Sequence, residues 1–229
     1  MASTPVACQN ILMHPPRIDL WPIAVVSAER VHGSLTRCGP GYRPKGWPDS
    51  AHVRRVALGR LLPNYLIASH ITAAWVWQAA LSPNPGESPL RAIAHPSKRT
   101  ANRQLASSAE IHISHSRIAR TDMVYVDDLA VTTPLRTVLD LLRDRQTWSV
   151  AQQSACKQFF RSTGALLEIV REELTHVTHP ANTIARERLD ALKLPGLTAP
   201  RHTSGKLPGA STPPSGSEAD GRGRRSDLG

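Results

Sequence analysis

VTTPLRTVLDLLRDR, residues 131–145, carries the clearest local signal in this 229-residue chain. It predicts the end of a strand, a stop at two threonines, and then a helix over residues 134–145. Thr133 can cap this helix with its side-chain oxygen, and Pro134 suits the first helical position because its missing N–H would have no partner there. The apolar face of the helix is spaced at i, i+3, i+4 and i+7 and consists of Leu135, Val138, Leu139 and Leu142.

Arg136 is the unusual residue of this helix. It lies in the first turn, where the positive end of the helix dipole opposes a cation by roughly a few tenths of a kcal/mol. Asp140 follows four residues later, and an i,i+4 ion pair between them would return about 0.3–0.5 kcal/mol. Arg136 is therefore either a structural clasp to Asp140, which the spacing favours, or a hook for a phosphate or carboxylate at the helix start.

Upstream of this stretch, short apolar runs predict a small sheet. A helix that begins at Ser69, which would cap it, and runs to residue 80 is apolar on nearly all sides, so we expect it to be buried. The predicted fold class is α/β (or α+β), with a small mixed sheet from residues 90 to 132 flanked by the helices at 69–80 and 134–145. The predicted strands are LRAIAHP, EIHISHS, MVYV and LAVT, which begin at residues 90, 110, 123 and 129.

Further helical patterns lie on both sides of this sheet. One runs over residues 51–62 and can be capped by Asp49 or Ser50. Three more occur between residues 149 and 194 and predict a helical C-terminal part. Residues 195–229 are rich in Pro, Gly, Ser and Arg and predict a disordered tail. Residues 1–16 show no periodic pattern, and we expect a flexible N-terminus.

The composition favours an anionic partner. The chain has a formal net charge of +10, and half of it lies between residues 17 and 60, where eight Lys or Arg residues stand against three acidic ones. This balance favours nucleic acid first and an acidic protein second. Three cysteines without a CxxC spacing are typical of a reducing compartment. Because the chain shows no signal-peptide pattern and its most apolar stretch, residues 61–81, is interrupted, we expect a cytoplasmic protein without a membrane span.

The segment CGPGYRPKGWP, residues 38–48, combines turn residues with aromatic and basic side chains. Tyr42 and Trp47 alternate with Arg43 and Lys45, and such a loop can stack on bases or grip phosphate. The alternative, which we favour, is a loop pinned to the body by its two rings.

Catalytic and metal-binding chemistry is weakly indicated. His112 and His115 would point to opposite faces of one strand, so along a regular strand the two cannot chelate one metal together. If the strand ends at Ser114, His115 could turn back and His95 could join as a ligand, but a zinc site would still need a fourth ligand or an open position. A metal-dependent nuclease needs carboxylates that converge on a cation. The acidic residues that could serve are Asp122, Asp127, Asp128 and Asp140. We therefore predict no catalytic residue, no metal site and no cofactor.

Several motifs in order nevertheless resemble one family. LIASHITAAWVW, IHISHSRI and DMVYVDDLAVTTPLRTVLDLL resemble the AbiEi-type antitoxins of bacterial type IV toxin–antitoxin systems, in the branch common among actinobacteria. The likeness runs from about Leu35 to Leu142, is most specific in TTPLRTVLDLL, and continues loosely to Leu194. The residues that carry the motifs are Ser69, His70, Trp75, Thr133, Pro134, Arg136 and Asp140.

The resemblance implies a winged-helix DNA-binding domain followed by an α/β domain needed for antitoxin activity. Such proteins repress their own operon and counteract a nucleotidyltransferase-like toxin, and they are not enzymes. The present chain is too short before LTRCGPGYRP, residues 35–44, which resembles the exit through the wing. Residues 17–60 are thus expected to form a truncated or degenerate winged-helix-like region, and residues 61–194 the AbiEi-like α/β domain with C-terminal helices.

The resulting hypothesis is a non-enzymatic antitoxin or transcriptional-regulator-like protein. Its expected partners are a nucleotidyltransferase-like toxin, or the corresponding operon product, and DNA. If DNA is bound, the basic first quarter supplies the phosphate contacts, which we assign to Arg37, Arg43, Lys45, Arg54 and Arg55. The alternative hypothesis is a metal-dependent nuclease associated with mobile elements.

Overall fold

The computed structural model describes residues 14–97, 111–114, 116–126, 128–146 and 148–194. The chain divides into two units, Met1–Leu197 and Thr198–Gly229, and the second lies outside the described residues. The predicted disordered tail and most of the predicted flexible N-terminus also lie outside them.

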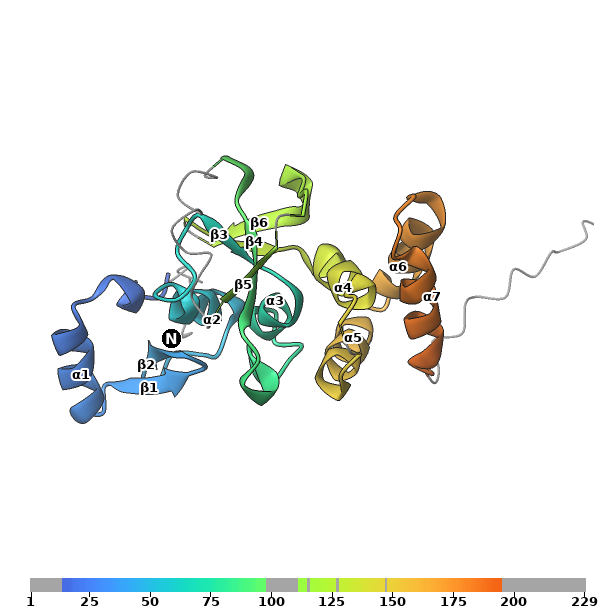
Figure 1. The fold of residues 1–229 in the computed structure, drawn as a ribbon. Coiled ribbons are helices and arrows are strands. Elements are labelled where there is room, and N and C mark those ends of the chain that lie inside the picture. The colour runs from blue at the N-terminus through green and yellow to red at the C-terminus, as the bar shows by residue number, and fades with distance from the viewer. Residues whose placement is uncertain (1–13, 98–110, 115, 127, 147, 195–229) are drawn as a thin grey trace, which may run out of the picture. The chain divides into compact units, whose positions relative to one another are not determined.

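The centre of the first unit is a mixed five-stranded sheet, shown in Figure 1. Its strands are β3 (Leu66–Ala68), β4 (Leu90–Ala94), β5 (Ile111–Ser114), β6 (Met123–Val126) and β7 (Leu129–Thr132), in the order β5-β4-β3-β7-β6. β4 runs parallel to β5 and antiparallel to β3, while β7 runs parallel to β3 and antiparallel to β6. The α/β fold with a small mixed sheet is therefore confirmed.

The central strand β3 was not predicted from the sequence. All three of its residues are buried, and it joins the two halves of the sheet by pairing with β4 on one side and β7 on the other. A strand of three apolar residues directly before a helix has too few positions to show a period of two. Its existence depends on its neighbours in the sheet.

Helix α3 (His70–Val76) is shorter than the predicted helix over residues 69–80. It ends where Gln78 takes a positive φ of 63°, a conformation that does not continue a helix. The predicted cap is also wrong, since within the described part of the chain the Ser69 side chain makes no capping hydrogen bond. Its hydroxyl instead lies 3.0 Å from Nδ1 of His70. The prediction that this helix is buried is confirmed.

Helix α4 (Pro134–Arg143) begins as predicted and ends two residues early. The Thr133 hydroxyl accepts a hydrogen bond from the Arg136 amide at 3.3 Å, which confirms the cap. Three C-terminal helices follow: α5 (Val150–Ser162), α6 (Leu166–His176) and α7 (Asn182–Ala191). They bury a common core with α4, which includes Leu141, Phe160, Leu167 and Leu174.

The N-terminal part consists of a short 3-10 turn η1 (Ile18–Leu20), helix α1 (Ile23–Val31), strands β1 (Leu35–Cys38) and β2 (Gly41–Pro44), and helix α2 (Ala51–Leu58). Further 3-10 turns are η2 (Pro85–Glu87) and η4 (Arg120–Asp122). β1 and β2 form an antiparallel hairpin, where the sequence had predicted a loop from residue 38 onward. Ser50 caps α2 as predicted, through a bond from the Val53 amide.

The backbone of β2 lies very close to that of α2, and this contact positions the hairpin. A Cβ at Gly41 would lie 2.1 Å from the Ala57 carbonyl oxygen, so only glycine lets β2 come this near to α2. Among the described residues, no helix is both long enough and apolar enough to cross a membrane.

Candidate nucleic-acid interface

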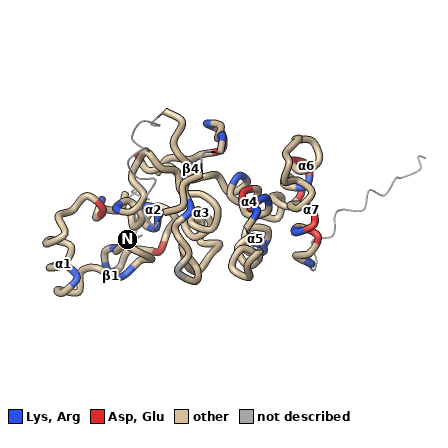
Figure 2. The backbone as a smooth tube through the Cα atoms, viewed as in Figure 1, with Lys and Arg blue, Asp and Glu red and all other residues tan. Residues whose placement is uncertain are grey.

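Exposed basic side chains gather on α1 and the β1–β2 hairpin. Arg30 lies in the last turn of α1, Arg37 lies on β1, and Lys45 directly follows β2; all three are exposed. Figure 2 shows basic positions at the end of α1 and along the hairpin. A helix followed by a hairpin thus displays several cations to solvent.

Tyr42 connects two of these cations. Arg37 is its cross-strand partner in the β1–β2 register, and the Arg30 guanidinium donates a hydrogen bond to the Tyr42 hydroxyl at 3.2 Å. This bond, and the positive charges of Arg30 and Arg37, lower the pKa of the Tyr42 phenol. We call Arg30, Arg37 and Tyr42 the basic–aromatic cluster. Guanidinium groups on such a surface can bind phosphate, and an adjacent ring can pack on sugar or base.

Two further predicted contacts lie on the same hairpin. The Lys45 side chain is exposed, while its amide is fixed by a bond to the Ser34 carbonyl at 2.8 Å. Arg43 is half-buried and donates a hydrogen bond to the Trp47 carbonyl. Tyr42 and Trp47 are both partly buried against apolar clusters, as expected for a segment pinned by its rings. The two rings of the hairpin are therefore partly buried, while Arg37 and Lys45 stay exposed beside them.

Arg55 is not a phosphate contact, and this prediction is wrong. Its side chain is 0% exposed, and its guanidinium donates to the carbonyl oxygens of Ala130 at 3.1 Å and Leu62 at 3.3 Å. Burial lowers the pKa of Arg55 to about 10, so the group remains charged at neutral pH. The reason is the position of α2, which packs on β2, α3 and β7 and so has little surface left for solvent.

Arg54 is also committed within the protein. It makes two bonds to the Asp49 carboxylate, at 2.8 and 2.7 Å, and donates to the Trp75 carbonyl at 2.7 Å. Its guanidinium lies 5.2 Å from the centre of the Trp75 ring, and its side chain is 15% exposed. The hydrogen bonds from Arg54 lower the pKa of Asp49. Arg54 therefore holds α2 to α3 and is a poor candidate for contact with DNA.

Arg136 is a structural clasp with more partners than the sequence predicted. Its guanidinium donates to Asp140 at 2.8 Å, to Asp122 at 3.1 Å and to the Arg117 carbonyl at 3.3 Å. The predicted i,i+4 ion pair is present. Burial raises the pKa of the Asp140 carboxyl to about 6, against the opposing effect of Arg136. The clasp fastens the start of α4 to the segment that leads into β6.

The acidic and histidine residues considered for metal chemistry are spread over the molecule. Asp122 and Asp140 share Arg136, while Asp128 receives hydrogen bonds from Arg17 and Asn64. His95 lies 2.6 Å from the Tyr125 hydroxyl. His115 and Asp127 lie outside the described residues, and within the described ranges no group of three or more His, Cys, Asp or Glu could hold a metal ion.

Arg30 and Tyr42 show what sequence reasoning missed. The sequence places Arg30 only within the basic first quarter, because the segment after Pro22 shows no clear apolar period that would predict a helix. In the structure this segment forms α1, whose apolar residues Ile23, Val25 and Val31 are exposed. Tyr42 was recognised only as a loop aromatic. A hairpin alignment of residues 35–44 would have placed Tyr42 opposite Arg37.

Comparison of the chain with protein-family models, with curated proteins and with solved structures finds no match. Its function is therefore inferred from its own residues and their geometry.

Proposed function

We propose that this protein is a non-enzymatic regulator of the AbiEi antitoxin type, which acts in the cytoplasm and binds DNA and a nucleotidyltransferase-like toxin. One observation carries the DNA-binding part of the proposal: α1 and the β1–β2 hairpin expose Arg30, Arg37 and Lys45 around Tyr42. The toxin partner is proposed from the resemblance of the sequence motifs. In this proposal α1 and the β1–β2 hairpin take the roles of the recognition helix and the wing that the resemblance to winged-helix regulators implies, and such a recognition helix enters the major groove.

Electrostatics supports DNA as one of the partners. The net charge of +10 favours a polyanion, and the basic–aromatic cluster places guanidinium groups where they can reach phosphates. With few other exposed groups on the hairpin to read base edges, the contacts favour backbone over sequence. Binding should therefore be strongly dependent on salt and weakly dependent on sequence.

The contacts of the acidic residues favour binding over cleavage. A nuclease metal needs carboxylates that are available to the cation. In this protein Asp122 and Asp140 are paired with Arg136, and Asp128 interacts with Arg17. These ion pairs support a structural role for the acidic residues.

The proposal that the hairpin binds DNA is tested with fluorescence anisotropy of a labelled duplex over a salt series. Replacing two phosphate contacts in an R37Q/K45Q double variant should reduce the log–log salt slope by about 1.8, since each contact contributes about 0.9. R161Q, on the exposed surface of α5, removes a positive charge outside the hairpin and should leave the slope nearly unchanged. An unchanged salt slope in R37Q/K45Q would show that DNA binds to another surface of the protein.

The proposal that the protein neutralises a toxin is tested independently, by expressing both proteins in one cell. Growth rescue from a nucleotidyltransferase-like toxin by the wild-type chain, and by R37Q/K45Q as well, would support toxin neutralisation without DNA binding. Cleavage of plasmid DNA in the presence of Mg²⁺, lost in D122N, would instead support the nuclease.

A further inference from the structure

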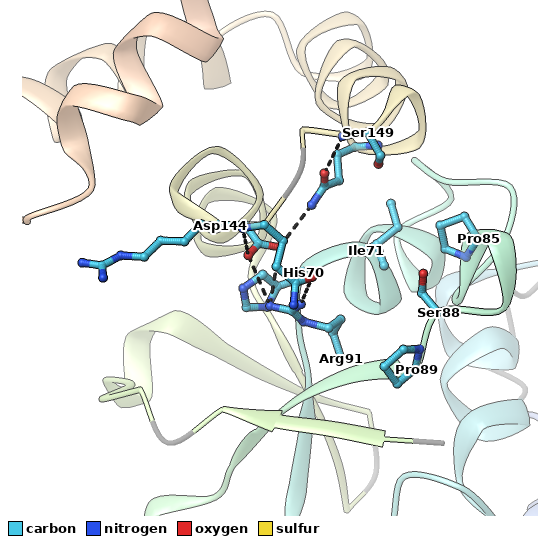
Figure 3. Close-up of a pocket in the computed structure, with 11 residues that line it drawn as sticks. His70, Ile71, Pro85, Ser88, Pro89, Arg91, Asp144 and Ser149 are labelled. Carbon is cyan, nitrogen blue, oxygen red and sulfur yellow. Dashed lines mark hydrogen bonds and ion pairs between the residues drawn. The ribbon is translucent and has the colours of Figure 1, made fainter. Parts of the chain in front are cut away.

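A cavity of about 610 Å³ lies between the start of α3, the entry to β4 and the connection from α4 to α5. Figure 3 shows His70, Arg91 and Asp144 close together on one side of it, with Ile71, Pro85 and Pro89 on the other. Its volume falls within the range of about 300–1,000 Å³ that is typical of small-molecule sites. No residue of α1 or of the β1–β2 hairpin lines it.

The polar wall of this cavity is held in place by its own hydrogen bonds. The Arg91 amide donates to the Thr72 hydroxyl at 2.9 Å, and the Arg91 carbonyl accepts from the Ser69 amide at 3.1 Å. The Gln152 side chain accepts from the Ser149 amide at 2.9 Å and donates to Asp144 at 3.2 Å. A ligand would therefore meet a preformed wall, which lowers the entropic cost of binding.

The Arg91 guanidinium is anchored but not saturated. One terminal nitrogen donates to the Gln146 side chain at 2.7 Å. The other lies 3.5 Å from each carboxylate oxygen of Asp144, at the limit of a hydrogen bond. Arginine has five N–H donors, so several remain for a ligand. The side chain is 12% exposed, and its charge is thus only partly screened by water.

The charges around the cavity are mostly positive. Arg91 and Arg145 line it against the single carboxylate of Asp144. Asp144 already accepts bonds from the Gln146 amide and the Gln152 side chain. Burial, and then the charge of Arg91, lower the pKa of His70 to about 3, so its ring is neutral at pH 7. His70 also has a positive φ of 49°, a strained conformation of the kind that clusters at functional sites.

We propose that this cavity binds a small organic anion, with a phosphate or carboxylate group on Arg91 and an apolar body against Ile71, Pro85 and Pro89. A guanidinium suits both kinds of anion because its planar N–H groups match two oxygens at once. This site is separate from α1 and the β1–β2 hairpin, where DNA is proposed to bind. It gives the α/β domain a ligand of its own.

Isothermal titration of the full chain tests the proposal with 1-naphthyl phosphate, 1-naphthoate, uncharged 1-naphthol and inorganic phosphate. At least one naphthyl anion should bind about tenfold more tightly than 1-naphthol and than inorganic phosphate. The stronger of the two anions identifies phosphate or carboxylate as the recognised group. Equal binding of 1-naphthol, equal binding of inorganic phosphate, or no binding by either naphthyl anion would overturn the proposal.

Variants separate recognition from folding. R91Q should weaken binding of the naphthyl anion by about tenfold, while D144N should strengthen it by about threefold because it removes the opposing charge. If Arg91 and Asp144 only held the cavity wall in place, both R91Q and D144N would weaken binding. R161Q, outside the cavity, should bind as the wild type does. Unchanged affinity in R91Q, or weakened affinity in D144N with an unaltered melting temperature, would contradict an anion on Arg91.

Discussion

Gly39 lies against the indole of Trp75, so that a Cβ at position 39 would come within 2.6 Å of Cζ2 of the ring. Gly39 also has a φ of 55°, which favours glycine over any other residue. Because Gly39 is in the hairpin and Trp75 is in α3, this contact seats the exposed basic hairpin on the α/β domain.

Replacing Gly39 with alanine should therefore destabilise the protein. We expect G39A to lose about 2–4 kcal/mol of unfolding free energy, from overpacking against Trp75 and from backbone strain. Urea unfolding followed by circular dichroism measures the loss. The matched control is G33A, where φ is also positive at 76° but no atom lies within 4 Å of the new Cβ. This variant should lose only about 1 kcal/mol, and an equal loss in both would refute the steric argument.

Asp140 should make stability fall as the pH rises. Its pKa is raised from 3.8 to about 6 in the folded protein. Between these values the folded state holds more protons than the unfolded chain, so the free energy of unfolding decreases with increasing pH. A pKa difference of about two units between the folded and unfolded states corresponds to roughly 3 kcal/mol of unfolding free energy. This contribution is lost between about pH 4 and pH 6, and above pH 6 it no longer changes.

The measurement is urea unfolding of the wild type and D140N at several pH values from 4 to 7. The amide of D140N does not titrate. The unfolding free energy of the wild type minus that of D140N should therefore decrease as the pH rises from about 4 to 6. The groups that act on Asp140 include Arg136, Arg143 and Asp122, and all three remain in both proteins. A difference that is independent of pH would show that Asp140 ionises normally.

Arg55 should matter for stability and not for DNA affinity. R55M removes the donors to the Ala130 and Leu62 carbonyls and should cost about 2–4 kcal/mol, because both acceptors then remain in a buried environment. R37M, at an exposed position, should change stability by only about 0.5 kcal/mol. Thermal melts combined with DNA anisotropy test this. A stable R55M with reduced salt dependence would return Arg55 to the interface.

The Arg30–Tyr42 contact predicts a shifted phenol titration. Arg30 and Arg37 lower the pKa of Tyr42 below its usual value of 10.0. R30Q removes the hydrogen-bonding cation and should raise this pKa back towards that value. Carbon-13 NMR of the labelled tyrosine rings follows Tyr42 separately from Tyr65 and Tyr125. An identical titration in R30Q would show that the basic–aromatic cluster does not form in solution.

Local sequence signals predicted what is local in the structure. The Thr133 cap, the start of α4 at Pro134 and the Arg136–Asp140 ion pair each depend on residues within one or two turns of each other. The strands β4, β6 and β7 also appear where apolar runs predicted them. Strand order was not predictable, because it depends on pairings far apart in the chain.

The wrong assignments share a different cause. Arg54 and Arg55 are predicted to be exposed because arginine is seldom buried, yet Leu58, three residues after Arg55 on the same face of α2, is fully buried, and so is Leu62 just beyond the helix. That spacing was a signal that Arg55 faces inward. The cavity beside His70 was beyond sequence reasoning, since its walls come from α3, β4 and the start of α5.

The bond between Arg55 and Ala130 has a consequence for synthesis of the chain. The two residues are 75 positions apart, and Ala68 of β3 pairs with Val131 of β7 at nearly the same place. As the chain leaves the ribosome, α2 is complete long before its buried cation can meet this acceptor. During this interval α1, α2 and the β1–β2 hairpin are not fully packed against the sheet. Their positive charges are then close to ribosomal RNA, which is a polyanion. Final seating of α2 is thus a late step, released only when the second half of the sheet emerges.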